Sequence, residues 1–208
     1  MTVKVKICGL TSLWDALKSA EYGADYLGFV FYPKSPRFIL PEKAFDIIRQ
    51  LPKGVKTVAV VVNVDIDFIK SLLDHGFDLV QLHGDETPEI LEEIPAKRVI
   101  KAFRVKDSLP EEEMKMWKGV YAFLLDTYKK GVYGGTGETF NWDIAKEAVD
   151  KGYKIFLSGG LTPENVAQAV RYVKPYAVDV SGGVELVKGK KDLEKVKKFI
   201  ENAKRALP

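Results

Sequence analysis

Two side chains capable of acid–base chemistry each close an apolar run. Cys8 ends the stretch VKIC just before a glycine, and Asp126 ends the stretch YAFLLD. A helix predicted soon after Cys8 would favour the thiolate, which is the basic form, through its positive end; alternatively, Cys8 packs as a small apolar residue. Apolar neighbours disfavour an ionised Asp126 and help it to hold a proton. A capping role for Asp126 is disfavoured, because the next predicted helix begins only near Trp142.

Two matching glycine turns follow later apolar runs: Ser158-Gly159-Gly160 and Ser181-Gly182-Gly183, 23 residues apart. Consecutive glycines in front of a helix expose backbone N–H groups, and the helix end adds positive potential. One such turn means little, but two on neighbouring strands predict a phosphate site. The residues assigned to phosphate binding are Gly159, Gly160, Ser181, Gly182 and Gly183.

Four further polar side chains are candidates for lining a binding site. Arg37, in FYPKSPR, offers a planar fork that suits a carboxylate, although a single arginine is more often solvated at the surface. Asp179 precedes the second glycine turn and is expected either to orient the substrate or the turn, or to serve only the fold. Gln81 and His83, in QLHG, form a polar pair in which His83 is a base or, as we favour, a hydrogen-bonded wall residue.

The glycine-rich stretch 127–139 predicts a mobile flap.

Composition bounds the class of protein. The 208 residues have 32 Lys and Arg against 29 Asp and Glu, a net charge of +3 that does not favour a nucleic-acid partner. A single cysteine and two histidines exclude a disulfide scaffold and a cysteine-based zinc site. The longest apolar run, Val120–Leu125, is far shorter than the roughly 20 residues that span a bilayer. We therefore expect a cytoplasmic protein with one domain over residues 1–208, and no membrane partner.

Eight strand-like runs alternate with eight helical patterns from end to end. The predicted strands are Val3–Cys8, Tyr26–Phe31, Lys56–Val62, Leu79–Leu82, Val99–Phe103, Tyr121–Asp126, Lys154–Leu157 and Ala177–Val180. The predicted helices are Ser12–Tyr22, Pro41–Leu51, Ile66–His75, Pro88–Ile94, Pro110–Trp117, Asp143–Lys151, Pro163–Tyr172 and Leu193–Ala206. This alternation predicts an α/β fold, a compact single-domain (β/α)8 TIM barrel, over a doubly wound open sheet, which usually has about five or six strands. A barrel gathers its chemistry where the strands end, which is where all the candidate residues lie.

The motifs at these strand ends resemble a known family. KICGLT, GFVFYPKSPR, QLHGDE, LLDT, YGGTGETFNW, LSGGLTPENV and VDVSGGVE are similar, in register from Lys4 to about Lys191, to phosphoribosylanthranilate isomerases of the tryptophan pathway. The resemblance implies an Amadori rearrangement of a small phosphosugar-anthranilate molecule, without metal or cofactor. It assigns Cys8 as general base, Asp126 as general acid, Arg37 as the carboxylate ligand and the glycine turns as the phosphate cradle. A monomer or a homodimer is expected.

Three alternatives stay open at this point. Histidine-pathway isomerases catalyse the same type of rearrangement with aspartates ending strands one and five, but this chain has Cys8 at the first position and no aspartate in Lys101–Arg104. Ribulose-phosphate epimerases use a histidine-rich metal site, which two histidines on different elements do not favour. A non-catalytic phosphosugar-binding barrel would not need Cys8 or Asp126, and both are present.

Overall fold

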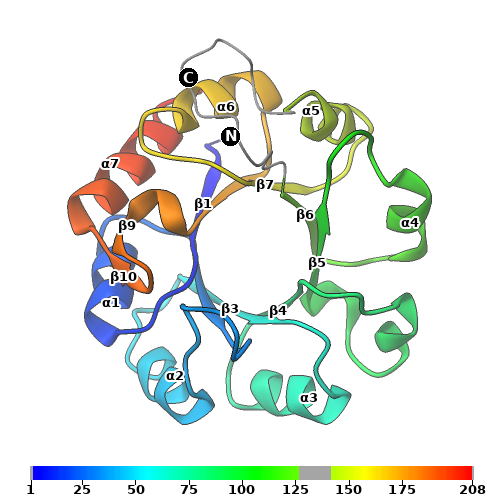
Figure 1. Ribbon diagram of the computed structural model, residues 1–208, viewed down its shortest axis with the longest axis horizontal. Helices are drawn as coiled ribbons and strands as arrows, with labels where there is room; N and C mark the ends of the chain where they lie inside the picture. The colour runs from blue at the N-terminus through cyan, green and yellow to red at the C-terminus, as the bar shows by residue number, and fades with distance from the viewer. Residues whose placement is uncertain (1, 127–141, 208) are drawn as a thin grey trace.

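Eight parallel strands close into a barrel with the helices around it (Figure 1). The computed structural model describes residues 2–126 and 142–207, so the flap predicted over 127–139 lies outside the described residues. The barrel strands are β1 (Lys4–Ile7), β2 (Tyr26–Val30), β3 (Lys56–Val61), β4 (Leu79–Leu82), β5 (Val99–Arg104), β6 (Ala122–Asp126), β7 (Ile155–Ser158) and β8 (Ala177–Val180). β8 pairs with β1 through four register positions, which closes the ring and confirms the predicted barrel over an open sheet.

The helices follow the predicted order but differ at several ends. They are α1 (Leu13–Glu21), α2 (Pro41–Ile48), α3 (Ile66–Asp74), α4 (Glu111–Met116), α5 (Trp142–Asp150), α6 (Val166–Val173) and α7 (Leu193–Lys204). Short 3₁₀ helices are η1 (Pro88–Glu92), η2 (Ala96–Arg98) and η3 (Gly182–Val184). In the described part of the chain, none of the helices has the length and apolar character needed to cross a membrane.

Two predicted helices are wrong in detail. The stretch predicted as a helix over Pro88–Ile94 forms only the 3₁₀ helix η1, because Pro88 and Pro95 leave room for less than two full turns between them. The helix predicted from Pro163 begins only at Val166. There, the Asn165 side chain accepts a hydrogen bond from the Thr162 N–H at 2.8 Å, which fixes a turn in front of the helix.

A short hairpin that the sequence patterns did not predict lies between the last strand and the last helix. It consists of β9 (Glu185–Val187) and β10 (Lys190–Lys191), paired antiparallel. Thr11 Oγ1 donates to the Gly189 carbonyl at 2.6 Å, and Lys191 N–H donates to Asp15 Oδ2 at 3.0 Å. The hairpin is therefore hydrogen-bonded to the segment that follows β1. It brings Glu185 and Lys191 near Cys8.

The apolar residues form two clusters separated by the barrel wall. The larger one fills the space between strands and helices. The smaller one fills the barrel and consists of Cys8, Tyr26, Val58, Val60, Leu79, Ile100, Ala102, Ala122, Leu124, Phe156 and Ala177. At the amino-terminal mouth, the hydroxyls of Tyr26 and Tyr121 lie 2.6 Å apart and those of Tyr26 and Tyr176 lie 3.0 Å apart. Because this end is filled by packed side chains, the polar chemistry is left to the opposite mouth.

Candidate active site

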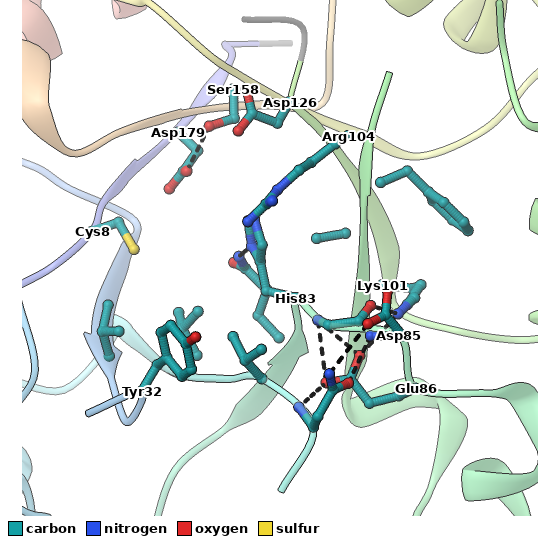
Figure 2. A pocket seen from close by; sticks show the side chains of 18 of the residues that line it. Cys8, Tyr32, His83, Asp85, Glu86, Lys101, Arg104, Asp126, Ser158 and Asp179 are labelled. Atoms are coloured by element: carbon teal, nitrogen blue, oxygen red, sulfur yellow. Dashed lines mark hydrogen bonds and ion pairs between the residues drawn. The ribbon is translucent and has the colours of Figure 1, made fainter. Parts of the chain in front are cut away.

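The carboxyl ends of the strands surround a cavity of about 1010 Å³ (Figure 2). Seven of the residues predicted from the sequence line it: Cys8, Arg37, Gln81, His83, Asp126, Asp179 and Ser181. They come from β4, β6 and β8 and from the segments that follow β1, β2, β4 and β8. Residues that are up to 173 positions apart in the chain therefore share one space, as expected for the catalytic end of a barrel.

Cys8 follows β1 directly and turns its side chain into the barrel. Its N–H donates to the Val180 carbonyl at 2.9 Å, which continues the pairing of β1 with β8. The residue is 7% exposed, packs with the inner cluster and still lines the cavity. Cys8 is thus both an apolar packing residue and a thiol that a molecule in the cavity could reach.

Asp126 is the last residue of β6 and points into the cavity (Figure 2). It is half-buried, and in the sheet it lies in register with Arg104 of β5 and Ser158 of β7. Alternation along β6 places Asp126 on the same face as Ala122 and Leu124, which belong to the inner cluster. The alternation of side chains along β6 therefore places the Asp126 carboxyl group in the cavity.

Arg37, in the loop after β2, is held by a carboxylate that the sequence patterns did not single out. Its Nε donates to Glu185 Oε1 and its Nη2 to Glu185 Oε2, both at 2.7 Å. These two bonds use two of the five guanidinium donors. The Arg37 side chain is one-quarter exposed and lines the cavity, so the fork is fixed in orientation while it remains accessible.

Asp179 lies on β8, the strand before the second glycine turn, and its carboxylate contacts side chains of both neighbouring strands, β7 and β1. One carboxylate oxygen accepts from Ser158 Oγ at 3.0 Å, and the other accepts from Lys6 Nζ at 2.8 Å. The contact with Ser158 fits the predicted role of orienting a glycine turn, although that role stays a prediction. Lys6 itself is wholly buried, so the ion pair lies in the floor of the cavity.

Gln81 and His83 lie side by side on the inner face at the end of β4. Gln81 Nε2 donates to His83 Nδ1 at 2.9 Å, which leaves the proton of a neutral imidazole on Nε2. Burial lowers the pKa of His83, with Arg104 and Lys6 adding to this and Asp126 opposing it. The hydrogen bond and the lowered pKa favour a neutral wall residue over a base that cycles through the charged form.

Two buried polar atoms at the cavity have no hydrogen-bond partner among the described residues: Gln81 Oε1 and Ser181 Oγ. A buried polar atom without a partner is costly, typically by about 1–3 kcal/mol. Both residues line the cavity, so a ligand with hydroxyl groups or an acidic group would supply the missing bonds.

The four turn glycines lie at the same end of the barrel but are not among the described residues that line the cavity. Gly159 and Gly160 have positive φ values of 96° and 65°, which favour glycine. A Cβ at Gly183 would lie 1.9 Å from the Leu161 carbonyl oxygen. The loops after β7 and β8 therefore touch backbone to backbone, and this close approach explains the second glycine of the later turn.

Several charged residues at the cavity were not predicted from the sequence. Lys101 Nζ donates to Glu86 Oε2 at 2.9 Å and to the Gly84 carbonyl at 2.8 Å, and Arg104 reaches in from the end of β5 (Figure 2). Lys6 could have been found from strand alternation, since it lies two residues before Cys8 and hence on the same face. Within residues 2–126 and 142–207, His, Cys, Asp and Glu side chains form no group of three that could hold a metal ion.

Comparisons with known proteins agree with this geometry. Residues 5–202 match the family model of N-(5'-phosphoribosyl)anthranilate (PRA) isomerase. The chain is 57% identical to the N-(5'-phosphoribosyl)anthranilate isomerase of Aquifex aeolicus over 203 residues, covering 97% of this chain and 98% of that protein.

Solved structures give the same result. The crystal structure of phosphoribosyl anthranilate isomerase from Thermotoga maritima is 48% identical, with a TM-score of 0.84 over 97% of this chain and 98% of that one. A second such structure, in complex with reduced 1-(o-carboxyphenylamino)-1-deoxyribulose 5-phosphate, is 44% identical, with a TM-score of 0.83 over the same shares. By sequence and by structure, the chain belongs to the N-(5'-phosphoribosyl)anthranilate isomerase family.

Proposed function

We propose that this chain catalyses the Amadori rearrangement of N-(5'-phosphoribosyl)anthranilate to 1-(2-carboxyphenylamino)-1-deoxyribulose 5-phosphate, a step of tryptophan biosynthesis. The observation that carries the proposal is the position of Cys8 and Asp126, at the ends of β1 and β6, in one cavity. The related structure that holds a reduced form of this product supports the choice of substrate.

Asp126 is the general acid of the first step. Its proton passes to the ring oxygen of the ribose, and the bond from that oxygen to C1′ breaks as the anthranilate nitrogen shares its lone pair with C1′. The result is an open-chain Schiff base that carries a positive charge on nitrogen. The half-buried carboxyl group at the end of β6 points into the cavity, where it can reach the ring oxygen of a bound substrate.

Cys8 is the general base of the second step. The sulfur takes the proton from C2′, and the electron pair of the broken C–H bond forms the double bond between C1′ and C2′. The pair of the C=N bond returns to nitrogen, which gives a neutral enolamine that tautomerises to the ketone. Each general acid or base of this kind typically contributes about 10²–10⁴-fold to the rate.

The remaining residues bind the two acidic groups and the sugar. Arg37, fixed by Glu185, receives the anthranilate carboxylate, and the backbone of the glycine turns after β7 and β8 receives the phosphate. Gln81 Oε1 and Ser181 Oγ gain hydrogen bonds from the ligand. Neutral His83 accepts a hydrogen bond from Gln81 Nε2 and so fixes the orientation of the Gln81 amide. The chain's own side chains supply both acid and base, so the reaction requires no metal or cofactor.

The test uses the purified protein and the fluorescence of phosphoribosylanthranilate in the presence of EDTA. We expect conversion with the unaltered protein, and a loss of about 100-fold or more in kcat for Cys8→Ala and for Asp126→Asn. Both variants should still bind the reduced product. Asp74→Asn, an exposed aspartate at the end of α3, is the matched control and should keep full activity. Near-normal turnover in either cavity variant removes that residue from the mechanism, and binding without conversion by the unaltered protein identifies a non-catalytic binding protein.

We further propose a cytoplasmic enzyme that acts as a monomer or homodimer and has no nucleic-acid partner. The small net charge of +3 supports the last point. A related Thermotoga maritima structure, 45% identical, is of monomers generated from a dimeric isomerase. Light scattering on the purified protein distinguishes the two assembly states.

A further inference from the structure

Buried charged side chains lie close to Cys8. Lys6, two residues earlier on β1, is on the same face of the strand, and its side chain is 0% exposed. Its Nζ donates to Asp179 Oδ1 of β8 at 2.8 Å. An ammonium group without solvent contact must be compensated by nearby negative charge or it would give up its proton.

Gly28 shows how close Lys6 comes to the sulfur. A Cβ at Gly28 of β2 would lie 2.8 Å from Cys8 Sγ and 3.2 Å from Lys6 Nζ. Both groups therefore occupy the space that a side chain would fill at this point of β2. Glycine in a strand interior marks such a close approach. The sulfur and the ammonium nitrogen share one small space inside the barrel.

A second lysine reaches Cys8 from the hairpin. Lys191 Nζ donates to the Cys8 carbonyl at 2.6 Å, to the Ser181 carbonyl at 3.2 Å and to Glu185 Oε1 at 3.3 Å. Three acceptors match the three N–H bonds of an ammonium ion, whereas a neutral amine has two. Burial lowers the pKa of Lys191, but Glu185 and Cys8 counter the effect. The geometry therefore describes a charged lysine behind the cysteine.

Three cations and two carboxylates lie around Cys8. They form two hydrogen-bonded groups, Lys6 with Asp179 on one side and Arg37 and Lys191 with Glu185 on the other. Burial would lower the pKa of Lys6, yet Asp179 and Cys8 together raise it. The titratable and charged side chains that face the cavity from the other elements are Tyr32, His83, Asp85, Glu86, Lys101, Arg104 and Asp126.

We infer that Lys6, whose ammonium nitrogen shares the space around Cys8 Sγ, stabilises the thiolate form of Cys8, with Lys191 as a second nearby cation. The inference deepens the proposed function, because a sulfur that is already ionised needs no further side chain to take its proton before it acts. When the thiolate takes the C2′ proton, an S–H bond forms as the C–H bond breaks, and the sulfur becomes neutral. The substrate changes from a cationic Schiff base to a neutral enolamine, so total charge is conserved. Lys6 is a positioning residue, since it acts through Cys8.

The experiment exploits the fact that Cys8 is the only cysteine. The rate of alkylation by iodoacetamide and the ultraviolet absorbance of the thiolate, both measured against pH, report on this one sulfur. In the unaltered protein we expect thiolate at neutral pH. In Lys6→Met we expect thiolate only as the pH approaches about 8.5, the ordinary value for a thiol. Turnover of Lys6→Met should fall about tenfold or more at neutral pH and recover in alkaline buffer.

Lys6→Met leaves Asp179 buried without its partner, which destabilises the fold. A second variant therefore tests the inference without an unpaired buried charge. Lys6→Met combined with Asp179→Asn removes both charges, and it should again show thiolate only in alkaline buffer. Lys4→Met is the matched control, an exposed lysine on the same strand, and should titrate like the unaltered protein. An unchanged thiolate profile in a folded Lys6 variant overturns the inference, even if Cys8→Ala is inactive. A shifted profile together with an active Cys8→Ala supports the role of Lys6 and refutes Cys8 as the base.

Discussion

Both carboxylate oxygens of Glu185 accept a hydrogen bond from the Arg37 guanidinium, each at 2.7 Å. The pair joins the first residue of the hairpin to the loop after β2, although the two residues lie 148 positions apart. The Glu185 side chain is only 5% exposed. The guanidinium plane is therefore fixed before any ligand arrives, which lowers the entropy lost when a carboxylate binds to it.

Glu185→Gln should weaken substrate binding more than it slows the reaction. An amide cannot accept both charge-assisted bonds, so Arg37 loses its fixed plane and the KM for phosphoribosylanthranilate should rise about tenfold or more. Steady-state kinetics give the split between KM and kcat. Glu164→Gln, at an exposed ion pair with Lys198, is the control and should leave both unchanged. An unaltered KM in Glu185→Gln would show that Arg37 does not need this partner.

His83 predicts a pH dependence of stability. Burial lowers its pKa in the folded protein from the ordinary value of 6.5, so the unfolded chain binds the proton more tightly. The stabilisation is thus complete above about pH 6.5 and is lost as the pH falls through the folded-state pKa. Urea unfolding at pH 7.5 and at pH 5 should show a smaller loss of unfolding free energy in His83→Gln than in the unaltered protein. His75→Gln, at the only other histidine, which is exposed, should keep the original pH slope. Equal slopes in all three proteins would contradict the prediction.

Gly28→Ala should damage catalysis out of proportion to its effect on stability. The added Cβ would lie 2.8 Å from Cys8 Sγ, so the sulfur must move. A displacement near 1 Å at a reacting atom costs on the order of 100-fold in rate, whereas an overpacked methyl group typically costs about 1–3 kcal/mol of stability. Turnover and thermal unfolding measured together test this. Gly152→Ala, where a Cβ meets nothing within 4 Å, should lose some stability through its φ of 87° but keep its turnover.

The second glycine turn offers a matched pair of variants. A Cβ at Gly183 would lie 1.9 Å from the Leu161 carbonyl oxygen, whereas one at Gly182 would meet Arg37 Nη2 only at 3.3 Å. Gly183→Ala must separate the loops after β7 and β8, and we expect it to raise the inhibition constant of inorganic phosphate about tenfold or more. Gly182→Ala should have a clearly smaller effect, since a contact at 3.3 Å is relieved by a shift of only a few tenths of an ångström. The reverse order would show that the two loops do not form the phosphate site.

The barrel could be predicted from sequence because its strands are nearly continuous apolar runs. β4 and β8 have the predicted bounds, and the other strands differ by one or two residues. The cavity residues followed from one rule, that barrel chemistry lies at strand ends. The failures have local causes: two prolines confine η1, and the Asn165 side chain delays α6.

The charge network was harder to predict because its members are distant in the chain. Lys6 and Asp179 are 173 positions apart and meet only because β1 pairs with β8 in one particular register. Glu185 and Lys191 reach the site through a hairpin whose strands have three and two residues, too short to give a periodic pattern. A single sequence contains no direct record of such contacts.

The hairpin also determines when, during synthesis of the chain, the contacts of the site can form. Lys191 follows Cys8 by 183 positions, so a ribosome makes almost the whole chain before this contact can form. At about 5–20 residues per second, synthesis of that stretch takes on the order of ten to forty seconds. Throughout this time Cys8 lacks its contact with Lys191, and the hydrogen bonds around it are complete only after Lys191 has been added and the hairpin has folded.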